Sequence, residues 1–136
     1  MRISWEEYAL RLAFTASLRS EDLHKKVGAC ILRHDNSVAS LGYNGPPSGV
    51  EIDWSDRDER RKRVIHAEAS ALKWIKPEEG RLIAVTLAPC PNCVNLIASY
   101  GIRDIIYLTE YEQDMERLSF KLCKEFKIKI RKITLK

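Results

Sequence analysis

The second half of the chain alternates apolar runs with helix-forming segments, and this alternation constrains the fold more than any other feature. Runs expected to form strands cover Leu82 to Leu87, Asp104 to Leu108 and Lys127 to Ile133. Helical segments, about Val94 to Tyr100 and about Gln113 to Phe126, lie between them. Because strands joined by a helix usually run parallel, this order predicts a layered α/β sheet.

The first half adds a helix and two further strands. Apolar residues recur at helical spacing from Trp5 to Leu18, and Ser4 followed by Glu7 matches a capping box at the start of that helix. Val27 to Leu32 and Val38 to Leu41 are β-prone runs joined by a polar turn, which predicts a hairpin. A further helix is expected from His66 to Ile75, where strong helix formers continue until Pro77 and Gly80 stop them. The expected element order is therefore αββαβαβα followed by a last strand.

Length and composition narrow the class of protein. A chain of 136 residues with 45% hydrophobic content predicts one domain, residues 1–136. No apolar stretch approaches the roughly 18 residues of a membrane span, and Glu6 and Glu7 interrupt the start where a secretory signal would be apolar. A net charge of +4 is too small for a dedicated nucleic-acid binder. We therefore expect a cytoplasmic protein with no membrane or polynucleotide partner.

Two motifs stand at expected helix starts: His66-Ala67-Glu68, and Pro89 to Cys93 with the pattern P-C-P-N-C. With Pro91 at the first helical position, Cys90 becomes the cap and Cys93 lies one turn later, so both sulfurs can point to one spot. The helix dipole there favours thiolates. One imidazole and two thiolates suit zinc, and three protein ligands leave a fourth position open to water.

An open coordination position is typical of a catalytic zinc site. Zinc lowers the pKa of bound water from 15.7 to about 7, which provides a nucleophile at neutral pH. Glu68 lies two residues from His66 and is the expected proton carrier.

Cys30 lies in an apolar strand and Cys123 on the apolar side of the last helix, so both are expected to be core residues.

At this point the sequence resembles the zinc-dependent cytidine and deoxycytidylate deaminases, whose signature is H-x-E with P-C-x-x-C. The resemblance is greatest to deoxycytidylate deaminases, and its blocks span nearly the whole chain: Arg19-Ser20, Val27 to Cys30, Gly42 to Gly49, His66 to Glu68, Val85 to Leu87 and Pro89 to Cys93. It implies a three-layer α/β/α fold with a five-stranded mixed sheet. It also implies hydrolysis of deoxycytidine monophosphate (dCMP) to dUMP and ammonia, with one catalytic Zn²⁺ held by His66, Cys90 and Cys93.

The same resemblance implies further binding residues. Asn44, Ala67 and Tyr111 correspond to substrate-contacting positions, with Asn44 beside the sugar and Tyr111 stacking on the base. The loop Gly42 to Gly49 resembles a regulatory motif where dCTP activates and dTTP inhibits, with Mg²⁺ as a companion of the triphosphate. The regulatory residues expected from it are Lys26, Gly42, Tyr43, Asn44, Gly45 and Gly49. Family members usually form hexamers, so a homo-oligomer is implied.

Two alternatives share the zinc signature. An editing deaminase acting on transfer RNA adenosine or single-strand cytosine would need a basic, aromatic-lined channel, whereas acidic residues from Asp53 to Glu59 crowd the loop beside this site. A catalytically silent zinc-stabilised module would not need Glu68.

The charged stretch Asp56 to Arg63 is expected to be a loop, either solvated or phosphate-binding. Ser70 replaces an asparagine that is common in the family.

Overall fold

One mixed sheet of five strands organises the computed structural model of the protein, which describes residues 1–111 and 113–135. The elements along the chain are α1 (Trp5–Ser17), β1 (Gly28–Arg33), β2 (Val38–Tyr43), α2 (Arg57–Arg63), α3 (Ala67–Leu72), β3 (Gly80–Leu87), α4 (Pro91–Ser99), β4 (Asp104–Thr109), α5 (Gln113–Glu125) and β5 (Lys129–Lys132). The strand order is β2-β1-β3-β4-β5. β1 is antiparallel to both neighbours, and β3, β4 and β5 run parallel to one another.

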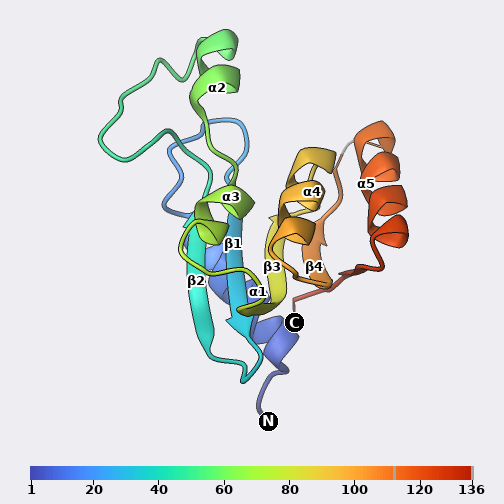
Figure 1. Ribbon diagram of the computed structural model, residues 1–136. Coiled ribbons are helices and arrows are strands. Elements are labelled where there is room, and N and C mark those ends of the chain that lie inside the picture. Colours follow the sequence, from blue (N-terminus) through green and yellow to red (C-terminus); the bar gives the residue numbers. More distant parts are fainter. Residues whose placement is uncertain (112, 136) are drawn as a thin grey trace.

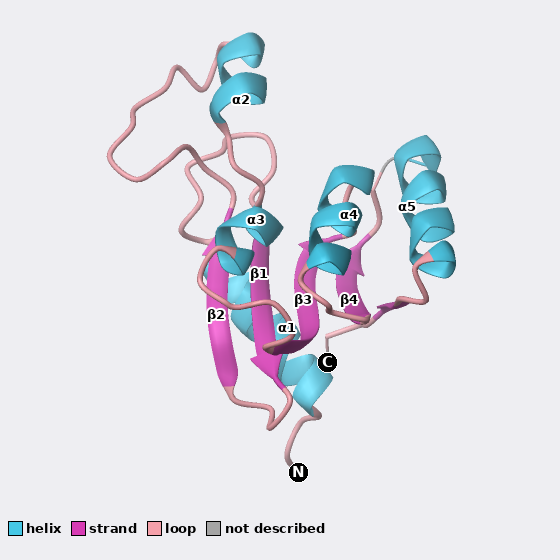
Figure 2. Cartoon of the chain, viewed as in Figure 1, coloured by secondary structure: helices cyan, strands magenta, loops and turns pink. Residues whose placement is uncertain are grey.

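Helices cover both faces of this sheet, as Figures 1 and 2 show. α1 packs on one face, mainly against β1, β3 and β2. On the opposite face α3 packs against β2 and β1, and α4 contacts both α3 and α5. These layers confirm the expected three-layer α/β/α fold with a five-stranded mixed sheet. α2 stands apart, beyond the end of the sheet where β3 and β4 finish (Figure 1).

Two apolar clusters fill the spaces between the layers. Successive residues of a strand point to opposite faces, so Ile31 packs under α3 and α4 while its neighbour Leu32 packs under α1. The central strand β3 is divided in the same way, with Ile83 on the first face and Leu82 on the second. Because β1 and β3 are buried on both faces, they form a rigid base for the loops at their ends.

Glycines allow two of these layers to approach closely. A β-carbon on Gly28 would lie 1.8 Å from the Ala13 carbonyl oxygen of α1. A β-carbon on Gly42 would lie 2.6 Å from the Ala67 carbonyl oxygen and 2.5 Å from the Ala71 amide nitrogen of α3. All three distances are far below van der Waals contact, so Gly28 and Gly42 are required for packing.

Ser4 is confirmed as the N-cap of α1, since the amide of Glu7 donates a hydrogen bond of 3.1 Å to the Ser4 hydroxyl, which is one of the two bonds of a capping box. The expectation that Asp56 to Arg63 forms a loop is wrong, because Arg57–Arg63 is the helix α2. Its N-cap Asp56 accepts hydrogen bonds from the amides of Asp58 and Glu59, which stabilises a helix that has no apolar face.

Among the described residues, no helix combines the length and apolar character needed to cross a membrane.

Candidate active site

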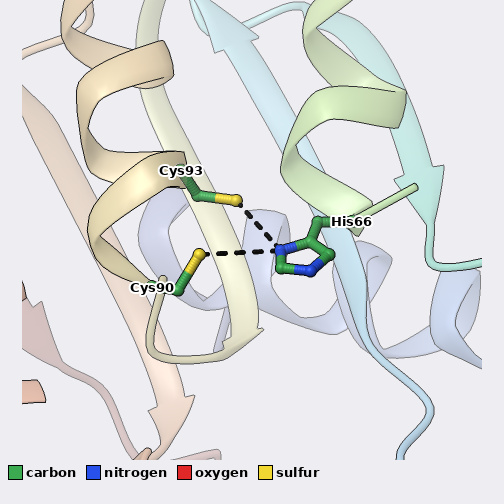
Figure 3. Close-up of side chains that lie close together, drawn as sticks. All are labelled: His66, Cys90 and Cys93. Carbon is green, nitrogen blue, oxygen red and sulfur yellow. Dashed lines mark hydrogen bonds between the residues drawn. The ribbon is translucent and has the colours of Figure 1, made fainter. Parts of the chain in front are cut away.

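Three predicted metal ligands lie together although they come from two helices. Nδ1 of His66 lies 3.3 Å from the sulfur of Cys93 and 3.6 Å from that of Cys90. All three donor atoms lie within 4.8 Å of one another. Figure 3 shows the imidazole of His66 pointing between the two sulfurs. The structure therefore brings the predicted ligands to one point.

Helix starts position each of these side chains. His66 is the N-cap of α3 and Cys90 is the N-cap of α4, and neither side chain is used in a capping hydrogen bond. Pro91 occupies the first turn of α4, as the sequence predicts, and Cys93 lies one turn after Cys90. The hydroxyl of Ser119 in α5 donates a hydrogen bond of 2.7 Å to the carbonyl of Pro89, which fixes the chain entering α4.

The pKa values of Cys90 and Cys93 favour one ionised sulfur in the cluster. A hydrogen bond from the Cys93 thiol, together with the imidazole of His66, lowers the pKa of Cys90 to about 4. The same bond and burial raise the pKa of Cys93, so the negative charge rests on Cys90. Cys30 and Cys123 differ, because burial alone raises their pKa values to about 12 and about 11. Both lie in the core, which confirms their predicted role.

The donor set fits a zinc ion. Tetrahedral zinc with Zn–S bonds of about 2.3 Å and Zn–N bonds of about 2.05 Å places nitrogen and sulfur ligands about 3.6 Å apart. The nitrogen–sulfur distances of 3.3 and 3.6 Å match this separation. One imidazole and two sulfurs are also the ligand types that zinc prefers in proteins.

Glu68 lies in the same cavity as His66 but is not among the clustered donors. It lies in the first turn of α3 and its side chain is 4% exposed. Burial raises the pKa of its carboxyl from 4.5 to about 7. A carboxyl that titrates near neutral pH can both accept and donate a proton during one reaction cycle.

A cavity of about 480 Å³ opens beside this cluster and is lined by all the predicted substrate-contacting residues, Asn44, Ala67 and Tyr111. Its wall also includes His66, Glu68 and Cys90. Four cationic side chains line it as well: Lys25, Arg57, Arg60 and Arg61. The cavity therefore joins a metal-ligand cluster, a titratable carboxyl and a concentration of positive charge.

Asn44 holds the loop before β1 in place. Its side-chain oxygen accepts a hydrogen bond of 2.8 Å from the Val27 amide, and its Nδ2 donates to the Lys25 carbonyl at 2.9 Å and to Asp22 at 3.2 Å. These bonds fix the segment that carries Lys25. A bridge between Gly45 and Ile65 then ties the neighbouring loop to the residue before His66.

Tyr111 also lines the cavity, next to this loop segment. The ammonium of Lys25 is 5.1 Å from the centre of the Tyr111 ring, which is a cation–π contact. The backbone amide of Tyr111 donates a 2.8 Å hydrogen bond to the Glu116 carboxylate of α5. An aromatic ring is therefore held in the cavity wall.

A second cavity, also of about 480 Å³, contains most of the predicted regulatory residues. Tyr43, Asn44, Gly45 and Gly49 line it together with Arg19 and Trp54, among others. Gly42 and Lys26 are not among its lining residues, and Gly42 instead packs against α3. Asn44 lines both cavities and is therefore shared by their walls.

Two parts of this site were not predicted from the sequence. The arginines near residue 60 were expected in a loop, either solvated or phosphate-binding, whereas the helix α2 places Arg57, Arg60 and Arg61 in the cavity wall. The capping residue Asp56 was the available indication of a helix there. No role was expected for Ser119, which has no exposed surface and braces the loop before Cys90.

Comparisons with known proteins agree with this geometry. Residues 3–109 match the model of the cytidine and deoxycytidylate deaminase zinc-binding region. Deoxycytidylate deaminase of Mus musculus is 35% identical, over 89% of this chain and 76% of the mouse protein. The human enzyme of that name is 33% identical, over 84% of this chain and 70% of its own length.

A crystal structure of dCMP deaminase from the cyanophage S-TIM5, in complex with dCMP and dUMP, superposes with a TM-score of 0.82. It is 27% identical, and the match covers 98% of this chain and 99% of the phage protein. The matched family model describes a zinc-binding region and spans both ligand motifs, and the structural match supports the fold. The chain is a member of the cytidine and deoxycytidylate deaminase family.

Proposed function

We propose that the protein hydrolyses dCMP to dUMP and ammonia with one zinc ion as cofactor. The observation that carries this proposal is the cluster of His66, Cys90 and Cys93 donor atoms, which adjoins the cavity lined by the buried residue Glu68. The choice of dCMP is supported by relatives named deoxycytidylate deaminase and by the phage enzyme with bound dCMP and dUMP.

Three side chains hold the metal and one moves protons. His66, Cys90 and Cys93 are the ligands, and the bound zinc supplies a Lewis acid that makes water a nucleophile at neutral pH. The water oxygen forms a bond to C4 of the cytosine ring, and the bond from C4 to the amino nitrogen breaks. Glu68 takes one proton from the water and gives it to ring N3. It then takes the second proton from the new hydroxyl on C4 and gives it to the departing amine, which leaves as ammonia while C4 becomes the uracil carbonyl.

The remaining cavity residues orient the substrate. Tyr111 stacks on the cytosine ring from the cavity wall, where Lys25 already contacts it. Ala67 lies fully buried between the metal ligand His66 and Glu68 and faces the base. Asn44 keeps the loop beside the sugar in place through its hydrogen bonds.

Regulation by dCTP and dTTP at the second cavity is part of the same proposal, with Mg²⁺ accompanying the triphosphate and a homo-oligomer, a hexamer, as the working assembly. Two features of the structure support a regulatory triphosphate site at the second cavity. The second cavity contains Arg19 and the glycines Gly45 and Gly49, which suit phosphate groups. Asn44 lines both cavities, so a ligand in one can affect the loop that borders the other.

A substrate panel tests the proposed function. The zinc-loaded protein is incubated with deoxycytidine, cytidine monophosphate, dCMP and a short single-stranded oligonucleotide, each with and without dCTP or dTTP. We expect ammonia release to be fastest with dCMP, increased by dCTP and decreased by dTTP. A preference for the oligonucleotide would show that the substrate is a polynucleotide and not dCMP. Insensitivity to both triphosphates would refute the proposed regulation by dCTP and dTTP.

A further inference from the structure

Helix α2 places three arginines in the wall of the active-site cavity. Arg57, Arg60 and Arg61 line it together with His66 and Glu68. The helix stands beyond the end of the sheet, above the starts of α3 and α4 that carry the metal ligands (Figure 1). The positive charge therefore lies toward the outer part of the cavity, while the reacting groups lie at the helix starts below it.

Three acidic residues of this region accept hydrogen bonds from backbone amides. Asp56 caps α2, and Glu59 accepts a hydrogen bond from the amide of Asp53. Asp22, also in the cavity wall, accepts hydrogen bonds from the amides of His24 and Lys25. Among the described residues, no ion pair within 4.0 Å involves an arginine of α2.

Arg60 carries a donor that lacks an acceptor. Within the described part of the chain, its Nε is closed to solvent and has no hydrogen-bond partner. Such unpaired buried donors are uncommon in folded proteins. Arg81 and Arg131 also have one, but of these three arginines only Arg60 lines the active-site cavity. A small rotation of its side chain would turn the guanidinium toward a ligand oxygen there.

We propose that α2 binds the 5′-phosphate of the nucleotide substrate, with Arg60 at the centre of the site and Arg57 and Arg61 beside it. This inference rests on the proposed deamination, because it assigns the phosphate of that substrate. Guanidinium groups match phosphate geometry and bind it through paired hydrogen bonds. A phosphate held at the outer part of the cavity leaves the base, at the far side of the sugar, directed toward Glu68 and the metal ligands.

The surroundings favour a single phosphate group over a continuous polynucleotide backbone. Asp56 and Asp58 are exposed on the same helix, where they would repel further phosphates leaving the cavity. A single-strand channel also uses a series of aromatic side chains, whereas Tyr111 is the sole aromatic residue among those that line this cavity. The arginines are therefore specificity-determining residues that distinguish a nucleoside monophosphate from a nucleoside.

The test compares substrates with and without the phosphate. kcat/KM is measured for dCMP and for deoxycytidine with the wild-type protein, Arg60→Gln, and the double variant Arg57→Gln/Arg61→Gln. Arg63→Gln is the matched control, because Arg63 is exposed on the same helix and does not line the cavity. We expect the ratio of kcat/KM for dCMP to that for deoxycytidine to fall about 10- to 100-fold in Arg60→Gln, the effect of losing a charged hydrogen bond. The control should keep the wild-type ratio.

A binding measurement separates this inference from the proposed function. Calorimetry with the zinc-loaded protein compares the product dUMP with deoxyuridine. If dUMP binds more tightly and Arg60→Gln removes the difference, the phosphate site stands, even if no ammonia is released from dCMP and the proposed deamination fails. If the wild type deaminates dCMP but both arginine variants keep its substrate ratio, the phosphate inference is overturned. A loss confined to oligonucleotide binding overturns it as well.

Discussion

Nδ1 of His66 lies 3.3 Å from Sγ of Cys93, although 27 residues separate them in the chain. The contact exists because two helices, α3 and α4, start side by side above the sheet and present their first residues to one another. A metal ion bound there would link the starts of these two helices. Its loss would therefore affect the shape of the whole cavity.

Removing one ligand should remove the zinc. His66→Ala and Cys93→Ala each leave two protein ligands, so we expect zinc content to fall from one ion per chain to below about a tenth, since a site with two ligands binds zinc weakly. Elemental analysis of the purified variants measures this directly. Cys123→Ala is the control, because Cys123 is buried in the core away from the cluster and should keep its zinc. Full occupancy in either ligand variant would disprove that ligand assignment.

Glu68→Gln should separate metal binding from catalysis. The amide keeps the size of the side chain and cannot carry the proton, so we expect zinc content and fold to be retained while kcat falls about 10²-fold or more. Steady-state kinetics with dCMP and a circular-dichroism spectrum are the two measurements. A rate equal to wild type would exclude Glu68 from the mechanism.

The burial of Glu68 also predicts a dependence of stability on pH. Its folded-state pKa of about 7 lies above the ordinary value of 4.5, so the folded state holds the proton more tightly and loses stability as pH rises from about 4.5 to about 7. In chelator-treated protein, Glu68→Gln should therefore unfold at higher denaturant than wild type at pH 8, by about 3 kcal/mol. The difference should become small near pH 4. Equal stabilities at pH 8 would show that the carboxyl is not held in a desolvated site.

The sequence predicted the sheet, the two metal-bearing helix starts and the N-cap of α1 because each depends on local chemistry. Hydrophobic periodicity identifies the strands, and Pro91 and Ser4 mark helix starts within a few residues of their effect. α2 was missed because it has no apolar face to produce a helical period, and only the cap Asp56 indicated it. Gly42 was read as a phosphate contact, while its closeness to Ala67 depends on tertiary packing that no local pattern records.

The close packing of Gly42 gives a prediction about stability. Gly42→Ala places a β-carbon against the backbone of α3, so we expect a loss of about 1–3 kcal/mol in the free energy of unfolding, the usual cost of overpacking. Gly45→Ala is the matched control, since a β-carbon there would meet no atom within 4 Å. Urea titrations of both variants measure the difference. Equal midpoints would show that β2 and α3 can separate without cost.

In the proposed reaction, the cluster of His66, Cys90 and Cys93 holds the zinc ion on which deamination of dCMP depends. The most direct test is the rate of ammonia release from dCMP before chelation, after removal of the metal, and after zinc is returned to the same sample. We predict steady release with one dUMP formed for each ammonia, a loss of activity with the metal, and recovery with zinc. Ammonia release that continues unchanged in metal-free protein, or none from the zinc-loaded protein with or without dCTP, would contradict the account.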